Sequence, residues 1–170
     1  MVTKLLGAVF VMAGCGGCGL AMILHRKKTE NCLSELSEVL SFMEWELQYR
    51  MTPLPSLCES AAAMCKTSLK KLFSRLSEEL RSQFFPNAEI CMRSSICATA
   101  DIPEPVAALL STLGATLGKF DAEGQIQGIR GVRARCEEQR AALRQDSANR
   151  LRSIETLWLC AGAVLVILFL

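Results

Sequence analysis

The chain has 170 residues, of which 51% are hydrophobic and only 6% aromatic, and its formal net charge is +2. Residues 29–153 contain 15 Lys and Arg against 16 Asp and Glu, so the positive surplus comes from Lys4 and Arg26-Lys27-Lys28. A nucleic-acid-binding domain concentrates positive charge on its folded part, and this distribution disfavours that class. A basic run beside an apolar segment indicates lipid head groups as partners instead.

The N-terminal part of the chain predicts a membrane anchor. Twenty uncharged residues run from Leu5 to Leu24, and at about 1.5 Å per helical residue they match the roughly 30 Å hydrocarbon core. Met12-Ala13-Gly14-Cys15 loosely resembles a lipoprotein cleavage box, but the apolar run continues well beyond Cys15. This continuation favours a retained anchor over a cleaved signal peptide. Residues 1–28 are therefore expected to form a transmembrane anchor with a basic flank.

Between residues 29 and 153, apolar residues recur at three- and four-residue steps and turn signals separate the runs. Helices are predicted over about 31–50, 53–65, 69–84 and 88–98, then through Val106 to Leu113, and from Asp121 onward. At the first break, Thr52 is expected to cap a helix with Pro53 at its first position. At the last break, Gly118 is expected to be a left-handed stop and Asp121 a cap.

The C-terminal segment, residues 154–170, repeats the membrane signal more weakly. Glu155 lies near its start, and the uncharged stretch from Leu157 to Leu170 is short for a span. A transmembrane helix is expected here, with a terminal core helix and an interfacial helix as the open alternatives. The fold class is thus all-α, an antiparallel bundle of about six helices over residues 29–153 flanked by an N-terminal and a C-terminal transmembrane helix.

Positive charges flank both apolar segments on the side of the middle domain. Arg26-Lys27-Lys28 follow the first segment, Arg150 and Arg152 precede the second, and only Lys4 lies on the far side. By the positive-inside rule, the bundle is expected in the cytoplasm.

Few residues are suited to catalysis. The single histidine, His25, lies at the edge of the first apolar segment, which disfavours histidine-based acid–base chemistry and most zinc sites. Cys15 and Cys18 have the spacing of a redox or metal pair, but no second pair completes a four-sulfur site. No enzyme activity, metal or cofactor is expected, and most of the nine cysteines are expected to be buried free thiols. A membrane-anchored thiol redox protein using Cys15 and Cys18 is the alternative.

Two blocks resemble the stage III sporulation protein AB family. Residues 40–57, LSFMEWELQYRMTPLPSL, are similar to its Leu-Glu-x-Glu-Ile/Leu-x-Tyr helix end followed by Thr-Pro-Leu-Pro. Residues 113–125, LGATLGKFDAEGQ, resemble its Leu-Gly-x-x-Leu-Gly-x-Ser-Asp-x-x-Gly-Gln segment. Phe120 replaces the usual small hydroxyl residue, and Trp45 stands where a small polar residue is common.

The resemblance implies a cell-membrane component, on the mother-cell side, of the channel-like complex between mother cell and forespore during endospore formation. The family's soluble domain is similar to the cytoplasmic domain of type II secretion F proteins, a non-catalytic membrane platform. The implied partners are a cytoplasmic secretion-type ATPase, other membrane components of the channel and membrane lipids. A homo-oligomer is a further expectation.

The family motif also implies two groups of site residues. We hypothesise that both motif turns lie at one end of the bundle, away from the membrane, with helix-punctuating residues beside a partner-binding surface. The structural-turn residues are Thr52, Pro53, Leu54, Pro55, Gly118, Asp121 and Gly124. The partner-binding candidates are Glu44, Glu46, Tyr49, Lys119 and Gln125.

Overall fold

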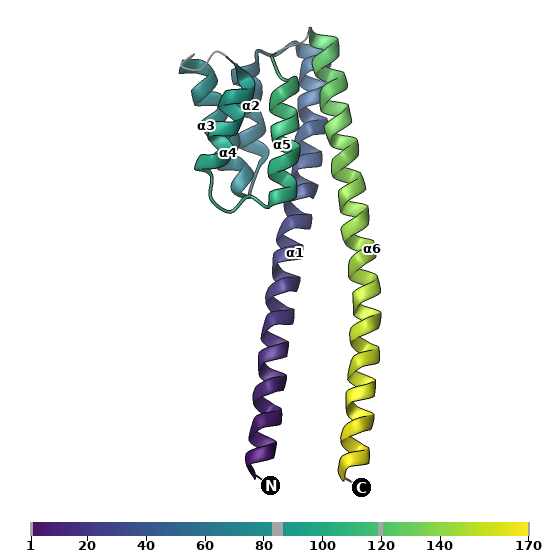
Figure 1. Cartoon of the computed structure of the whole chain (residues 1–170). Coiled ribbons are helices and arrows are strands. Elements are labelled where there is room, and N and C mark those ends of the chain that lie inside the picture. Colours follow the sequence, from purple (N-terminus) through teal and green to yellow (C-terminus); the bar gives the residue numbers. More distant parts are fainter. Residues whose placement is uncertain (1, 83–86, 119–120, 170) are drawn as a thin grey trace.

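In the part of the chain that it describes, the computed structural model contains helices joined by short turns and no strands (Figure 1). It describes the backbone of residues 2–82, 87–118 and 121–169, and the side chains of residues 24–82, 87–118 and 121–146. The prediction of an all-α fold with six helices is confirmed for these residues. The helices are α1 Val2–Arg50, α2 Leu54–Met64, α3 Ser68–Ser82, α4 Ala88–Ala98, α5 Glu104–Thr116 and α6 Ala122–Phe169.

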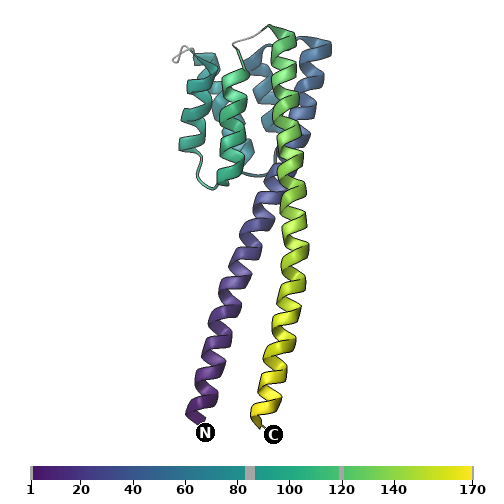
Figure 2. The same ribbon diagram turned by 45° about the vertical axis from the view of Figure 1, so that its right-hand side comes forward.

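Two long helices dominate the shape of the molecule. α1 has 49 residues and α6 has 48, so each is about 70 Å long at the usual rise per residue. They lie side by side and antiparallel, and both extend in the same direction beyond α2–α5 (Figures 1 and 2). The two chain ends therefore lie close together at one end of the molecule, remote from the short helices.

The first helix is longer than its sequence pattern predicts. A separate helix starting near Asn31 was predicted, but α1 runs without interruption from Val2 to Arg50. The physical reason is that residues 20–50 contain neither glycine nor proline, and nothing else in this stretch ends a helix. The Thr29 hydroxyl instead donates to the His25 carbonyl, 3.1 Å away, within the same helix.

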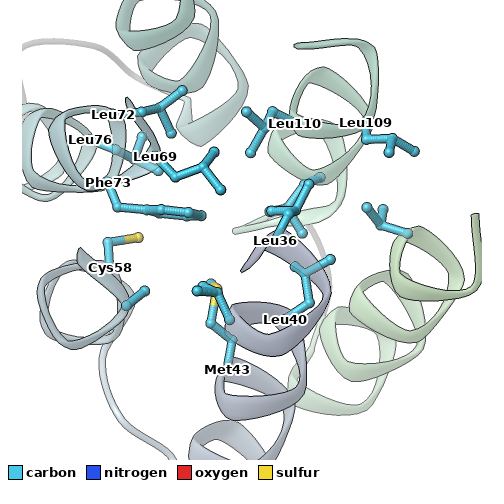
Figure 3. Packing of buried hydrophobic residues seen from close by; sticks show 14 of the residues in the cluster. Leu36, Leu40, Met43, Cys58, Leu69, Leu72, Phe73, Leu76, Leu109 and Leu110 are labelled. Atoms are coloured by element: carbon cyan, nitrogen blue, oxygen red, sulfur yellow. The ribbon is translucent and has the colours of Figure 1, made fainter. Parts of the chain in front are cut away.

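The core lies between the second half of α1 and helices α2–α6. α1 contributes the predicted stripe, in which Leu33, Leu36, Leu40 and Met43 are fully buried. Phe73 of α3 packs toward this stripe, and Figure 3 shows leucines of α3 and α5 closing the same cluster. Side chains from the other helices that complete the buried cluster include Leu57, Cys58, Leu69, Leu72, Leu76, Met92, Val106, Leu110, Leu113, Ile129, Val132 and Cys136.

Polar contacts reinforce the pairing of α1 with α6 at the end of the bundle that faces the chain termini. Glu30 of α1 accepts a 2.7 Å hydrogen bond from Arg144 of α6. Arg26 of α1 donates to Asp146 of α6 at 3.2 Å. These contacts lie at the last residues of α6 whose side chains are described, so the two helices are still held together where they leave the bundle.

The predicted membrane segments, residues 5–24 and 154–170, fall outside the residues with described side chains, apart from Leu24. Within the described part of the chain, no helix combines the length and the apolar character that a membrane crossing requires.

Candidate functional site

The structure brings the two motif turns together. An ideal Cβ added to Gly118 would lie 3.4 Å from the Cβ of Ala88 and 3.9 Å from the Cδ2 of Leu54. The α1–α2 turn, the α5–α6 turn and the start of α4 thus meet at the end of the bundle opposite the chain termini (Figure 1). We call this end of the molecule the distal end.

Glu46 organises the turn between α1 and α2. Its side chain is buried, and its Oε2 accepts a 2.7 Å hydrogen bond from the Thr52 hydroxyl. Its other oxygen accepts from Arg50 at 3.2 Å. Met51 between these donors adopts a φ of 49°, in the left-handed region, so the chain reverses sharply after α1.

The assignment of Thr52 as the cap of α2 was wrong. The residue preceding α2 is Pro53, and no side chain caps this helix. Thr52 lies one residue too early, and its hydroxyl is engaged by Glu46 instead. Pro53 itself is therefore just outside the helix, where its carbonyl accepts a 2.9 Å bond from the Leu57 amide, and Pro55 occupies the first turn. Leu54, at the start of α2, is the turn residue that packs nearest Gly118.

The turn between α5 and α6 has the geometry that its sequence indicates. Gly118 has a φ of 77°, which an L side chain rarely adopts. The Asp121 carboxylate accepts a 3.1 Å hydrogen bond from the Gly124 amide, and the Asp121 carbonyl accepts one from the Gln125 amide at 3.0 Å. Asp121 therefore caps α6. Lys119 lies outside the described residues, and the Gln125 side chain is half-buried.

Glu44 joins α1 to α6 near the distal end. Its carboxylate accepts hydrogen bonds from Arg130 at 2.5 Å and from Arg133 at 2.9 Å, and it is only 13% exposed. Glu46, two residues later, points instead to the α1–α2 turn, as expected for this spacing on a helix. Both carboxylates proposed as partner-binding groups are thus engaged within the molecule, and a direct role in binding stays a prediction.

An exposed aromatic surface occupies the end of α1. Trp45 is 48% exposed, and Tyr49 is 67% exposed. Their ring centroids lie 5.8 Å apart, and the guanidinium of Arg50 lies 5.4 Å from the Trp45 ring centroid. Met51, the next residue along the chain, is 76% exposed. These four residues form what we call the aromatic surface.

The family motif implies Tyr49 as a partner-binding candidate, whereas Trp45 is not among the candidates predicted from the sequence. The available signal was their spacing of four residues, which places both on one side of α1, away from the leucine stripe. Large apolar side chains gathered beside a cation are suited to contact with another protein.

The buried cysteines Cys58, Cys65 and Cys136 are poor nucleophiles. Burial raises the pKa of the Cys58 thiol to about 12 and that of Cys136 to about 11. Burial, supported by the charge of nearby Glu35, also raises the pKa of Cys65 to about 12. These thiols are protonated at neutral pH and act as small hydrophobic groups. Cys15 and Cys18, on which the redox alternative depends, lie outside the residues with described side chains.

Comparison with known proteins agrees with the two motif blocks. The family model for stage III sporulation protein AB matches residues 4–170. Stage III sporulation protein AB of Bacillus subtilis (strain 168) is 26% identical, and the match covers 98% of this chain and 99% of that protein. A solved structure of stage III sporulation protein AB has a TM-score of 0.63 at 22% identity, over 72% of this chain and 98% of that chain, and supports the fold. Because the family model spans nearly the whole sequence, the chain belongs to the stage III sporulation protein AB family.

Proposed function

We propose that the protein is a non-catalytic platform in the mother-cell membrane, part of a secretion-like complex that joins mother cell and forespore. Family membership supports a role in sporulation. The platform role rests on the resemblance to type II secretion F domains and on the shape of the molecule. The expected partners are a cytoplasmic secretion-type ATPase, other membrane components of the channel and the surrounding lipids.

The observation that best supports the proposal is that the bundle and the two apolar segments lie at opposite ends of the molecule. A small bundle packs around one end of two long helices, and both helices continue in the same direction (Figure 1). The two apolar segments, residues 5–24 and 154–170, lie at the other end of these helices. A membrane at that end would hold the bundle by two neighbouring helices and turn the distal end toward the cytoplasm.

The aromatic surface is the proposed contact for the ATPase. Exposed Trp and Tyr side chains contribute more to protein interfaces than most residue types. Three large apolar side chains stay exposed outside the apolar core of the bundle, namely Trp45, Tyr49 and Met51. Their position at the distal end puts them on the side of the bundle farthest from the proposed membrane.

Copurification from sporulating cells tests this proposal. The full-length protein is expected to fractionate with membranes and to retain the ATPase through purification. The double variant Trp45→Ala, Tyr49→Ala should reduce ATPase recovery about tenfold or more, because loss of aromatic contacts at an interface centre costs over 1 kcal/mol. Met64→Ala is the matched control, since Met64 is 47% exposed at the end of α2 nearer the termini.

The outcomes separate the parts of the proposal. Equal ATPase recovery from the aromatic double variant and from wild type would remove the aromatic surface as the contact. Recovery of the wild-type protein in the soluble fraction, without the ATPase, would remove the platform function itself.

A further inference from the structure

A hollow of about 430 Å³ lies where α1 leaves the bundle toward the N-terminus. Three separate elements wall it: α1, the start of α3 and the turn between α4 and α5. The segments that wall it lie at the end of the bundle that faces the chain termini, whereas the end of α1 that carries the aromatic surface lies at the distal end (Figure 1). No residue of the proposed ATPase contact contributes to it.

Several residues that line the hollow carry hydrogen-bond donors, and we call them its polar wall. They include Lys27, Lys28, Asn31 and Ser68. The Ser68 hydroxyl donates to the Asp101 carbonyl at 3.5 Å, and Lys28 is paired with the Asp101 carboxylate. Ammonium, amide and hydroxyl donors together suit the oxygens of a phosphoryl group. The wall gathers these donors from α1 and α3, so the arrangement depends on the folded bundle.

The charges of the described lining residues do not cancel. The Lys28 Nζ lies 3.1 Å from a carboxylate oxygen of Asp101, and the two groups are 50% and 77% exposed. Lys27, also exposed, forms no ion pair with the described carboxylates. Because Asp101 is the one acidic side chain among the described lining residues, one positive charge is left for an anionic ligand.

The edge of the hollow toward the termini is apolar. It includes Leu24, which is 62% exposed and is the last residue of the uncharged run that begins at Leu5. A free phosphate would use only the polar wall, whereas a glycerophospholipid would also place its glycerol and acyl carbons against Leu24. The order along α1, apolar residue first and lysines next, matches the order of acyl chain and headgroup in a lipid leaflet.

We infer that this hollow binds the phosphoryl headgroup of an anionic phospholipid, with Lys27 and Lys28 as the cationic side chains that contact the headgroup. The inference rests on the proposed membrane placement of the chain. It makes the hollow a lipid-specific contact between the bundle and its own membrane, in addition to the two apolar segments.

Native mass spectrometry of the detergent-solubilised full-length protein tests the site. Phosphatidylglycerol is expected to remain bound in preference to phosphatidylcholine. The double variant Lys27→Ala, Lys28→Ala should lose at least about fivefold of the phosphatidylglycerol affinity, since each surface lysine contributes to anionic lipid binding. The control Lys70→Ala, Lys71→Ala removes the same charge from exposed positions of α3 that do not line the hollow, and it should retain wild-type affinity.

A second pair of variants changes the affinity in the opposite direction. Asp101→Asn removes the carboxylate that competes for Lys28 and should raise the phosphatidylglycerol affinity by about threefold. Asp101 has a φ of 76°, which asparagine also adopts readily, so the turn is preserved. Glu104→Gln is the control, because Glu104 is exposed at the start of α5 and does not line the hollow.

Equal losses in the Lys27/Lys28 and Lys70/Lys71 variants would overturn the inference, since they would show a general effect of charge. Displacement of the lipid by soluble glycerol 1-phosphate at equal concentration would overturn the lipid as the source of the phosphoryl group. Carbonate extraction of membranes distinguishes a failure of the lipid site from a failure of the proposed platform function. A chain that resists extraction but shows no headgroup preference keeps the membrane platform and loses the site.

Discussion

At the scale of single residues, two glycines differ in backbone conformation, and the comparison shows where a turn requires glycine. Gly118 is left-handed, with a φ of 77°, whereas Gly131 lies within α6 and has open space around it. A side chain at Gly118 would meet only ordinary van der Waals contacts, at 3.4 Å and beyond. Its requirement for glycine is therefore conformational rather than steric.

Gly118→Ala and Gly131→Ala are expected to change stability in opposite directions. Gly118→Ala should lower the free energy of unfolding by about 1 kcal/mol, because alanine is strained in the left-handed region. Gly131→Ala should raise it by up to about 1 kcal/mol, because alanine is the better helix former. Urea unfolding of the detergent-solubilised protein, followed by circular dichroism, measures both. Destabilisation by both variants would show that the backbone account of these sites is wrong.

Thr52 is a second example at the scale of single residues, because its hydroxyl donates a hydrogen bond to the buried carboxylate of Glu46. Thr52→Val should cost about 1–2 kcal/mol, since Glu46 would lose its 2.7 Å donor and keep only Arg50. Thr112→Val is the matched control, because the Thr112 hydroxyl donates only to the Ala108 carbonyl of its own helix. The same urea titration checks the pair, and equal costs would contradict an organising role for Glu46.

The limits of sequence reasoning are visible in these same residues. The leucine stripe of α1, the left-handed Gly118 and the Asp121 cap were readable because each depends on neighbours within a few residues. The partner of Thr52 could not be predicted from the sequence, because capping propensity alone does not reveal that a buried carboxylate competes for the hydroxyl. The partners of Glu44 and Lys28 were equally hidden, since those of Glu44 lie 86 and 89 positions away along the chain and that of Lys28 lies 73 positions away.

At the scale of elements, the pairing of α1 with α6 joins the first and last helices of the chain. Apolar contacts of Leu40 and Met43 with the core are accompanied by the ion pairs of Glu44 with Arg130 and Arg133. The carboxylate is 13% exposed, so these pairs are screened less than pairs on the surface. We therefore expect Glu44 to contribute to helix pairing more than the exposed ion pairs do.

Glu44→Gln should lower the free energy of unfolding by about 1–2 kcal/mol, since it removes the charge that two arginines share. Glu59→Gln should cost less than about 0.5 kcal/mol, because Glu59 and its partner Arg81 are both more than half exposed. Thermal unfolding in parallel at low and high salt measures the two variants. A cost for Glu44→Gln no larger than that for Glu59→Gln would assign the α1–α6 pairing to apolar packing alone.

At the scale of the whole molecule, the functional proposals depend on which side of the membrane the bundle occupies. The two chain ends lie together, and the aromatic surface lies at the distal end (Figure 1). A cytoplasmic ATPase can reach that surface only if the bundle is cytoplasmic. The basic residues 26–28 and the arginines 150 and 152 favour this orientation.

Cys97 offers a direct test of the orientation, because it is exposed on α4 whereas Cys32, Cys58, Cys65, Cys91 and Cys136 are buried. A membrane-impermeant maleimide should label Cys97 only after the cells are permeabilised. Thr3→Cys places a thiol on the predicted opposite side and should be labelled in intact cells, and Cys97→Ser should abolish the labelling that permeabilisation adds. Labelling of Cys97 in intact cells would put the bundle outside, where a cytoplasmic ATPase could not bind it.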